Sequence, residues 1–560
     1  MFFLEVISSS KSLFCLNPWG GTPLINLSKG KHMSQTKTQE FGKWRSFFWP
    51  VHNFELKKLL PMFFLFFFIS FNYTILRDTK DALIVTAPGS GAEAIPFLKV
   101  WGVLPMAVIF MIAYAKLSNV LSKTKLFYTT ISFFITFFAL FALFLYPNHD
   151  TLHPTVFADK LQAVLPQGLS GFIALLRNWT YALFYIMSEL WGSVAISLLF
   201  WGFANDITRV SESKRFYAMF GLGANFALLF SGPAIVYFSD IRNKLPPTVD
   251  AWGVSLNYML SMVVLSGLII MGVYWWINKN VLTDARFYDP SEVKKGKKEK
   301  PKMSLKESFA FLARSKYMGC LAILVIGYGI AINIVEVTWK GQLKLQYPNP
   351  NDYSTFMGYF STFTGAITIL MMLFVGGNVI RRFGWKTGAM ITPAVLLITG
   401  VGFFSFVIFR DYLTGVIAML GTTPLMLAVL FGTAQNIMSK STKYSLFDPT
   451  KEMAYIPLDQ ESKVKGKAAI DVVGARLGKS GGSLIQQGLI VACGSLALIT
   501  PYIAGILFII IFAWILAVKG LSKRFQQLTS EREEQSKAAE IAASADAAVN
   551  KESVQQGATS

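Results

Sequence analysis

Long apolar runs separated by short polar segments dominate the chain, beginning at Leu59 with LLPMFFLFFFISF. A helix needs about 20 apolar residues to cross the hydrocarbon core of a bilayer, and twelve runs in the sequence are that long. They fall at 59–87, 95–115, 126–146, 172–203, 215–238, 252–277, 316–339, 354–376, 387–409, 412–438, 464–492 and 496–518. The pattern therefore predicts an all-α polytopic membrane protein with twelve transmembrane helices.

Lysine and arginine gather in alternate loops between these helices. Loops 116–125, 278–315 and 377–386 are rich in them, whereas 147–171 and 239–251 are poorer. The same residues flank the first and last helices, at Lys57, Lys58, Lys519, Lys523 and Arg524. The positive-inside rule then predicts that both termini are cytoplasmic.

Short sequence matches link the two halves of the chain. Ile186-Met187-Ser188-Glu189 matches Ile437-Met438-Ser439-Lys440, and Gly223-Ala224-Asn225 matches Gly474-Ala475-Arg476, both at an offset of 251 residues. Asn72 and Lys80 have a looser echo in Asn333 and Lys340. Such matches favour two six-helix halves in a major-facilitator-like arrangement, with a site near the midplane between them. They also place Glu189 opposite Lys440 in that pseudo-symmetric site.

The predicted domains follow from this division. They are a cytoplasmic N-terminal segment at 1–58, a six-helix bundle at 59–277, a basic cytoplasmic linker at 278–315, a second six-helix bundle at 316–518, and a largely disordered cytoplasmic tail at 519–560. Residues 1–32 make a poor signal peptide. We interpret them as the product of an upstream start site before Met33, with a targeting segment as the alternative.

Composition agrees with a membrane protein, since 53% of the 560 residues are hydrophobic and only 15% are charged. Soluble globular chains are about 25% charged. The net charge of +20 lies largely in the loops, and no nucleic-acid-binding motif accompanies it, so we expect no nucleic acid partner. The three cysteines, Cys15, Cys320 and Cys493, are too scattered for a disulfide framework or a zinc site. We expect no metal and no cofactor.

The first predicted helix carries four ionisable residues, Arg77, Asp78, Lys80 and Asp81, before its apolar run resumes. A single helix of 29 residues would be roughly 43 Å long, so these charges would lie in its outer half. Charges there must face protein or a water-filled space. The alternative is that the helix ends near Leu76 and the charges belong to an extracytoplasmic loop.

Other ionisable residues also fall within predicted spans. They are Lys99, Arg177, Glu189, Glu336, Lys340, Lys465, Lys467, Asp471, Arg476 and Lys479. A charge at mid-bilayer costs at least about 2.5–3.5 kcal/mol, so such a set indicates a hydrated path or ion pairs. Because cations outnumber acids, we expect an anionic cargo with several charges, and Lys and Arg are the usual partners of phosphate. The structural alternative is that Glu189 and Glu336 each pair with a lysine and hold helices together.

One glycine-rich motif is misleading. Gly474-Ala-Arg-Leu-Gly478-Lys479-Ser480 resembles a P-loop, but it has three residues between the glycines where the motif needs four, and no strand precedes it. The glycines are interpreted instead as permitting close helix packing or bending near Lys479.

Four long segments resemble the non-mitochondrial ATP/ADP translocases, the nucleotide transporters of obligate intracellular bacteria and plastids. They are FNYTILRDTKDALIVTAPGSGAEAIPFLK, RNWTYALFYIMSELWGSV, INIVEVTWKGQLKLQYPN and KEMAYIPLDQESKVKGKAAIDVVGARLGKSGGSLIQQG. The resemblance covers about Phe41 to Lys523. It implies twelve spans and exchange of external ATP for internal ADP with phosphate. The family's important charged positions match Lys80, Glu189, Glu336 and Lys479. The match favours the bacterial inner membrane, and the plastid inner envelope is the alternative.

We therefore expect an ATP/ADP antiporter that works by alternating access, without catalytic residues. Lys80, Arg77, Lys479 and Arg476 are expected to hold phosphate. The residues expected to bind substrate or balance charge are Glu189, Glu336, Asp78, Asp81, Lys340, Lys440, Asn333 and Asn225. The expected partners are ATP, ADP, phosphate and membrane lipid, and the expected state is a monomer. The alternatives are a proton-coupled importer of other nucleotides or NAD, and a membrane-embedded enzyme acting on a phosphorylated lipid.

Overall fold

The computed structural model describes residues 52–284, 287–288, 307, 310 and 315–557. Within this part of the chain the regular structure is helical. We call the end of the bundle at which α3 (Leu56–Thr86) begins the inner end, and the opposite end the outer end. The sequence predicts that the inner end is cytoplasmic.

The N-terminal half contains six helical units. They are α3; α4 (Ala94–Phe97), η2 (Leu98–Val103) and α5 (Leu104–Val120); α6 (Lys123–Leu140) and η3 (Phe141–Leu145); α10 (Trp179–Trp191), η5 (Gly192–Phe200) and α11 (Trp201–Ile207); α12 (Val210–Ser239); and α13 (Ala251–Asn280). At the outer end the short helices α7 (His149–Leu152), α8 (Thr155–Val164), η4 (Gln167–Leu169) and α9 (Ser170–Arg177) lie between the third and fourth units. Six helical stretches of this half are long and apolar enough to cross a membrane.

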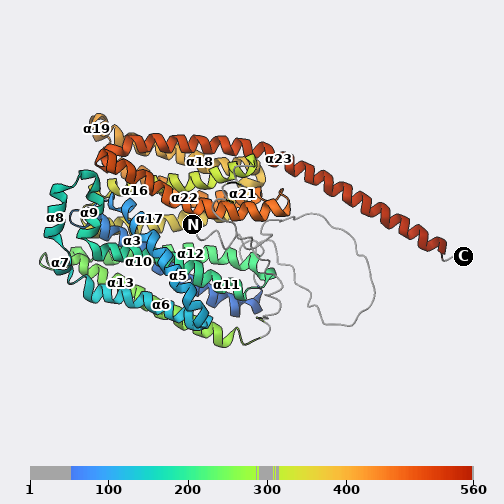
Figure 1. Cartoon of the computed structure of the whole chain (residues 1–560), viewed down its shortest axis with the longest axis horizontal. Helices are drawn as coiled ribbons and strands as arrows, with labels where there is room; N and C mark the ends of the chain where they lie inside the picture. The colour runs from blue at the N-terminus through green and yellow to red at the C-terminus, as the bar shows by residue number, and fades with distance from the viewer. Residues whose placement is uncertain (1–51, 285–286, 289–306, 308–309, 311–314, 558–560) are drawn as a thin grey trace.

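The C-terminal half repeats this arrangement. Its units are α16 (Lys316–Gln346); α17 (Pro350–Leu370) and η7 (Met371–Gly376); α18 (Gly377–Ile408); α20 (Pro424–Thr442), η8 (Lys443–Phe447) and α21 (Asp448–Ala454); α22 (Gln460–Cys493); and α23 (Leu496–Gly557). Figure 1 shows its helices, coloured yellow to red, lying over those of the N-terminal half in blue and green, with α23 extending beyond the bundle.

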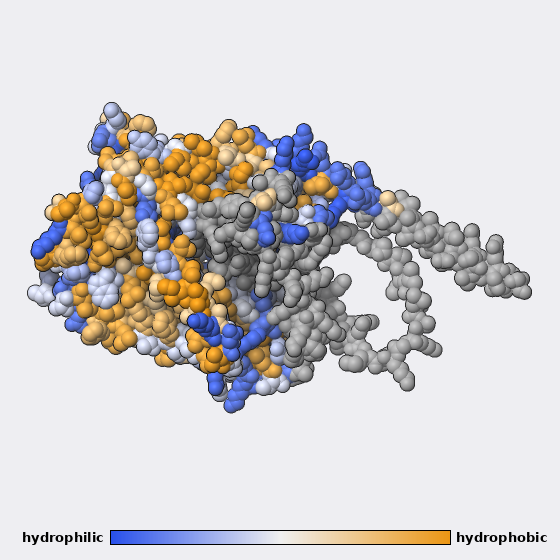
Figure 2. All heavy atoms as spheres, in the orientation of Figure 1, coloured by the Kyte–Doolittle hydropathy of each residue, from blue (hydrophilic) through white to orange (hydrophobic). Residues whose placement is uncertain are grey.

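Nine helical stretches among the described residues are long and apolar enough to cross a membrane. One of them, Pro350–Ile408, has 59 residues and crosses twice, because the backbone turns at Gly384, whose φ of 79° is in the left-handed region. The more polar α20 and α22 complete the twelve spans. Hydrophobic side chains cover much of the body of the molecule, and hydrophilic side chains gather where α23 leaves it (Figure 2).

The charged stretch from Arg77 to Asp81 lies within a continuous α3. The prediction of one long helix is therefore confirmed, and the alternative of a helix that ends near Leu76 is wrong. The helix continues because α10, α12, α13 and α17 pack around it and bury Asp78, Lys80 and Asp81. Buried charges of this kind require ion-pair or hydrogen-bond partners close by.

Glycines allow α22 to pack closely on α16, as the sequence predicted. Gly474, Gly478 and Gly482 form a stripe with a spacing of four residues, and a Cβ atom at Gly329 would lie only 2.6 Å from the Cα of Gly478. This contact sets the position of the helix that carries Arg476 and Lys479.

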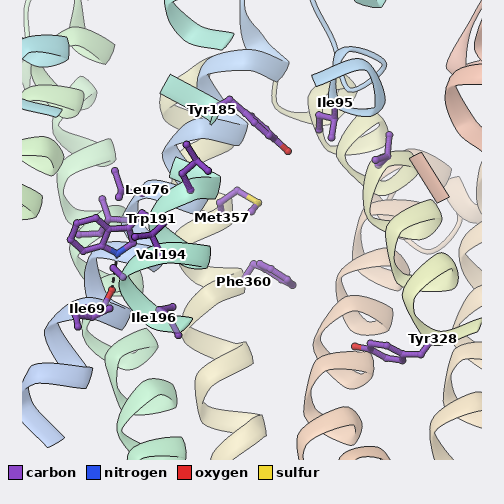
Figure 3. Close-up of a cluster of buried hydrophobic side chains, with 14 of the residues drawn as sticks. Ile69, Leu76, Ile95, Tyr185, Trp191, Val194, Ile196, Tyr328, Met357 and Phe360 are labelled. Atoms are coloured by element: carbon purple, nitrogen blue, oxygen red, sulfur yellow. Dashed lines mark hydrogen bonds between the residues drawn. The ribbon is translucent and has the colours of Figure 1, made fainter. Parts of the chain in front are cut away.

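Another close backbone contact lies between the two halves of the molecule. Helices α12 and α17 run against each other, and a Cβ atom at Gly358 would lie 2.8 Å from the carbonyl oxygen of Gly232. Within the N-terminal half, the indole nitrogen of Trp191 donates to the carbonyl oxygen of Ile69 at 3.1 Å, which fixes α10 against α3 (Figure 3). Together these contacts place α3, α10 and α17 around the buried charges.

Some predicted boundaries differ from the structure. The span predicted at 172–203 is divided at Asn178, whose side chain donates to the carbonyl oxygen of Pro88. The span predicted at 412–438 consists of a separate α19 (Arg410–Ala418) followed by α20. The predicted disordered tail differs too, since α23 continues to Gly557 through alanine, glutamate and glutamine, which are good helix formers. The predictions for residues 1–51 fall outside the described residues.

Candidate functional site

Lys80 occupies the centre of the buried charges on α3. Its amine lies 2.9 Å from Asp81 Oδ1 and 3.2 Å from Glu189 Oε1 on α10. The same amine sits 3.7 Å from the ring centroid of Tyr185, one turn before Glu189 on that helix. A lysine held between carboxylates and an aromatic face is stabilised as a cation although it is buried.

Asp81 extends this arrangement into the other half of the molecule. Its Oδ2 atom lies 2.7 Å from the amine of Lys340 on α16, and that amine lies 3.0 Å from Glu336 Oε1. The five side chains alternate in charge in the order Glu189, Lys80, Asp81, Lys340 and Glu336. We call this set the charge chain. It joins α10 and α3 of the N-terminal half to α16 of the C-terminal half.

A second polar cluster crosses the interface one turn away on α3. The Nε atom of Arg77 lies 2.9 Å from Asp78 Oδ1, and its guanidinium donates to Ser361 Oγ on α17 at 2.7 Å. Ser361 in turn donates to Asp78 Oδ2 at 2.5 Å. An arginine, a carboxylate and a hydroxyl from both halves therefore form a closed set of hydrogen bonds.

The two ends of the charge chain are accessible, whereas its middle is not. The side chains of Glu189 and Glu336 keep 22% and 24% of their surface exposed, and that of Asp81 keeps 1%. Glu189 lies well inside the unit formed by α10, η5 and α11, and Glu336 lies well inside α16, so this exposure indicates space for water beside the charge chain. Water can therefore reach the charge chain at its two terminal carboxylates, Glu189 and Glu336.

Two further lysines lie near the charge chain. Lys99 in η2 donates to Asn333 Oδ1 on α16 at 3.3 Å, and Ser483 on α22 donates to the same oxygen at 3.4 Å. Lys440 on α20 lies 4.8 Å from the ring centroid of Phe360. Both lysines are close enough to Glu336 to interact with it electrostatically.

Most of the predicted site residues are thus brought together. Those in or beside the network are Arg77, Asp78, Lys80, Asp81, Glu189, Asn333, Glu336, Lys340 and Lys440. The predicted residue Asn225 lies elsewhere on α12, where it donates to the carbonyl oxygen of Gly221 in its own helix. The side chains of Arg476 and Lys479, both on α22, fall outside the described residues.

Lys99 and Ser361 contact these residues but were not among the site candidates predicted from the sequence. The sequence offered a reason to suspect Lys99, because it is a charged residue within a predicted span. It offered no reason to suspect Ser361, since serine is common in transmembrane helices. Arg177, another charge assigned to a span, lies instead in α9 at the outer end, where its guanidinium is 2.6 Å from Asp159 Oδ1. The break at Asn178 explains that difference.

Twelve spans in two halves, joined through their interface by buried groups of both charges, define a polytopic transport protein. Residues 34–525 match the family described as "TLC ATP/ADP transporter". The chain belongs to this family.

Relatives occur in bacteria and plastids. "ADP,ATP carrier protein 1" of Chlamydia muridarum is 64% identical over 92% of this chain and 97% of its own length. "ADP,ATP carrier protein 1, chloroplastic" of Arabidopsis thaliana is 57% identical over 85% of this chain and 75% of its own length. Among solved structures, a bacterial homologue of the iron transporter ferroportin in an inward-facing state is 12% identical, with a TM-score of 0.48 over 86% of this chain and 100% of its own.

Proposed function

We propose that this protein is an ATP/ADP antiporter that imports ATP in exchange for ADP and phosphate by alternating access. The relatives named as ADP,ATP carriers support the choice of substrate. The observation that carries the mechanism is the ion pair between Asp81 and Lys340, because it joins the two halves through residues that a polyphosphate would also contact. A phosphate group and a carboxylate compete for the same ammonium groups.

The competition has a direct structural consequence. A phosphate oxygen that binds Lys80 or Lys340 weakens the hold of Asp81 on that lysine. Because Asp81 connects α3 to α16, binding also loosens a bridge between the halves. The lysine exchanges one counter-charge for another, so no buried cation is left without a partner, which would otherwise be costly.

Other contacts hold the halves together at the outer end. The amine of Lys344 on α16 donates to the carbonyl oxygen of Ser90. Arg242 lies 2.8 Å from Asp352 across the interface. These bonds, together with the ion pair of Asp81 and Lys340, have to break before the outer end can open.

This arrangement gives a reason for strict exchange. Without a nucleotide, moving the halves apart would separate Asp81 from Lys340 and leave each of these buried charges with one ion-pair partner instead of two. Losing a partner from a buried charge is costly. With a nucleotide, its phosphates supply the negative charge that Lys340 loses. Turnover is then coupled to an occupied site in both directions, as an antiporter requires.

The remaining features complete the proposal. We propose that the carrier works as a monomer in the bacterial inner membrane or the plastid inner envelope, with both termini in the cytoplasm and lipid around its apolar surface. Chemistry at the site is confined to binding, without hydrolysis. Lys80, Arg77, Lys479 and Arg476 hold the phosphates, and the carboxylates Glu189, Glu336, Asp78 and Asp81 balance charge.

Transport by purified protein in lipid vesicles tests the proposal. Vesicles loaded with ADP should take up labelled ATP rapidly, and empty vesicles should take up almost none. A protonophore should leave exchange unchanged, because the charge that is exchanged resides on the nucleotides. Equal uptake by empty and loaded vesicles would exclude obligatory exchange, and collapse of uptake with the protonophore would favour the proton-coupled importer instead.

A further inference from the structure

Lys99 reaches across the interface between the halves. It belongs to η2, a π-helical segment of the second transmembrane unit, and π segments within α-helices are frequent at functional sites. Among the described residues, its half-buried amine donates one hydrogen bond, to Asn333 Oδ1 of a neutral side chain at 3.3 Å. A neutral amide offsets little of the cost of placing an ammonium group in a protein interior.

Lys440 is in a comparable position in the other half. It is half-buried on α20, and its described contact is with the face of Phe360. By contrast, Lys80 and Lys340 each have two carboxylate oxygens within ion-pair distance. Among the described lysines beside the charge chain, Lys99 and Lys440 have no carboxylate oxygen within ion-pair distance.

The charges around this part of the interface also leave one lysine without a counter-charge. Lys80, Lys340, Lys99 and Lys440 supply four positive charges, and Asp81, Glu189 and Glu336 supply three negative ones. The pair of Arg77 and Asp78 is neutral. One positive charge therefore remains among these described residues, and it belongs to lysines that no carboxylate holds.

We propose that Lys99 and Lys440 are phosphate ligands of the nucleotide, one contributed by each half of the carrier. This assignment rests on the proposed function and adds Lys99 to its binding residues. The two lysines bind a phosphate group without first losing a carboxylate, whereas Lys80 and Lys340 have to exchange one. They therefore contribute affinity for the phosphates, and the charge chain couples occupancy to movement.

The experiment compares Lys99→Gln, Lys440→Gln and Lys99→Arg in vesicles loaded with ADP. Glutamine keeps a donor for Asn333 and removes only the charge, and arginine keeps the charge. Lys116→Gln is the matched control, because Lys116 is an exposed lysine of α5 in the same transmembrane unit. The measurements are the KM for labelled ATP and the inhibition of its uptake by unlabelled ATP, ADP and AMP.

Each glutamine variant should raise the KM for ATP at least about tenfold, since a hydrogen bond to a charged group contributes about that factor in binding. The preference for ATP over AMP should shrink, because the lost contact is with phosphate. Lys99→Arg should retain most of the wild-type affinity, and Lys116→Gln should retain all of it. Thermal unfolding of the detergent-purified variants checks that they fold.

The proposal is overturned if folded Lys99→Gln and Lys440→Gln keep the wild-type KM and the wild-type preference for ATP over AMP. It is also overturned if Lys99→Arg is as impaired as Lys99→Gln, because shape and not charge would then matter. Failure of the proposed function has a different signature: the wild-type protein itself would not exchange ATP for ADP. The two outcomes are therefore separable in one set of vesicles.

Discussion

The amine of Lys340 on α16 lies 2.7 Å from Asp81 Oδ2 on α3, so one buried ion pair joins the two halves of this carrier. Asp81 also forms an ion pair with Lys80, whose amine lies 2.9 Å from Asp81 Oδ1. A single carboxylate thus neutralises the lysines of two helices that hold equivalent places in the two bundles. The sequence echo between Lys80 and Lys340 acquires a physical meaning here, since both lysines converge on the same acid.

Replacing Asp81 with asparagine should destabilise the protein by about 3–5 kcal/mol, because it leaves buried ammonium groups short of a counter-charge. Lys340→Gln in the same molecule should recover part of that loss, with a coupling of about 1–3 kcal/mol. Unfolding of the purified single and double variants measures the coupling. Strictly additive effects would mean that the ion pair does not form.

Lys80→Ala should reduce ATP/ADP exchange by at least about a hundredfold, because it removes both a phosphate ligand and the link between Glu189 and Asp81. Lys57→Ala is the matched control, since Lys57 is an exposed lysine at the inner end of the same helix. Initial rates of labelled ATP uptake into vesicles loaded with ADP give the comparison. Comparable rates for the two variants would remove Lys80 from the site.

The outer contacts between the halves should differ in strength according to burial. Asn351 is buried and donates to Ser239 O at 3.0 Å and to Ser255 Oγ at 2.8 Å. Its neighbour Asp352 forms an exposed ion pair with Arg242, and exposed pairs contribute about 0–1 kcal/mol. Asn351→Ala should therefore favour opening of the outer end, and Asp352→Ala should change it little.

A cysteine at Ser354, which is buried at this interface, reports the opening. In a variant without other cysteines, a membrane-impermeant thiol reagent applied at the outer side should label it at least about threefold faster after Asn351→Ala than after Asp352→Ala. Because Asn351 and Asp352 are consecutive residues at the same interface, each of the two variants is the control for the other. Equal labelling rates would mean that burial does not decide how these contacts act.

His153 makes the stability of the outer loops dependent on pH. Its ring lies 4.8 Å from that of Tyr181, and its Nε2 atom is 2.7 Å from Thr180 Oγ1. Burial, and then the neighbouring His149, lower the pKa of His153 from 6.5 to about 4. The unfolded chain therefore binds a proton at a higher pH than the folded protein does, and stability falls as the pH drops from about 6.5 toward 4.

The expected loss at the acid end of this window is at most about 3 kcal/mol. Thermal unfolding of the detergent-purified protein between pH 7 and pH 4 measures it. His153→Gln should flatten the dependence, whereas His149→Gln should leave most of it, because burial is the larger cause. An unchanged pH profile in His153→Gln would assign the effect to another group.

The charged part of α3 shows how far a sequence could predict the site. Arg77, Asp78, Lys80 and Asp81 stand out because charge within a long apolar run is costly unless it has partners. The pattern could not name those partners. Ser361, which bonds to both Arg77 and Asp78, carries no signal in the sequence, and the break at Asn178 gave none that hydropathy could detect.

The amino-acid sequence by itself determined the twelve apolar spans, their division into two similar halves, and the cationic excess inside them, because the bilayer and the helix impose these patterns locally. Only the tertiary structure decided that Asp81 forms ion pairs with both Lys80 and Lys340, and that Lys99 donates to the neutral side chain of Asn333. These pairings join residues far apart in the chain. They depend on helix positions set by packing, such as the contact of Gly329 with Gly478, which the spacing of apolar residues does not encode.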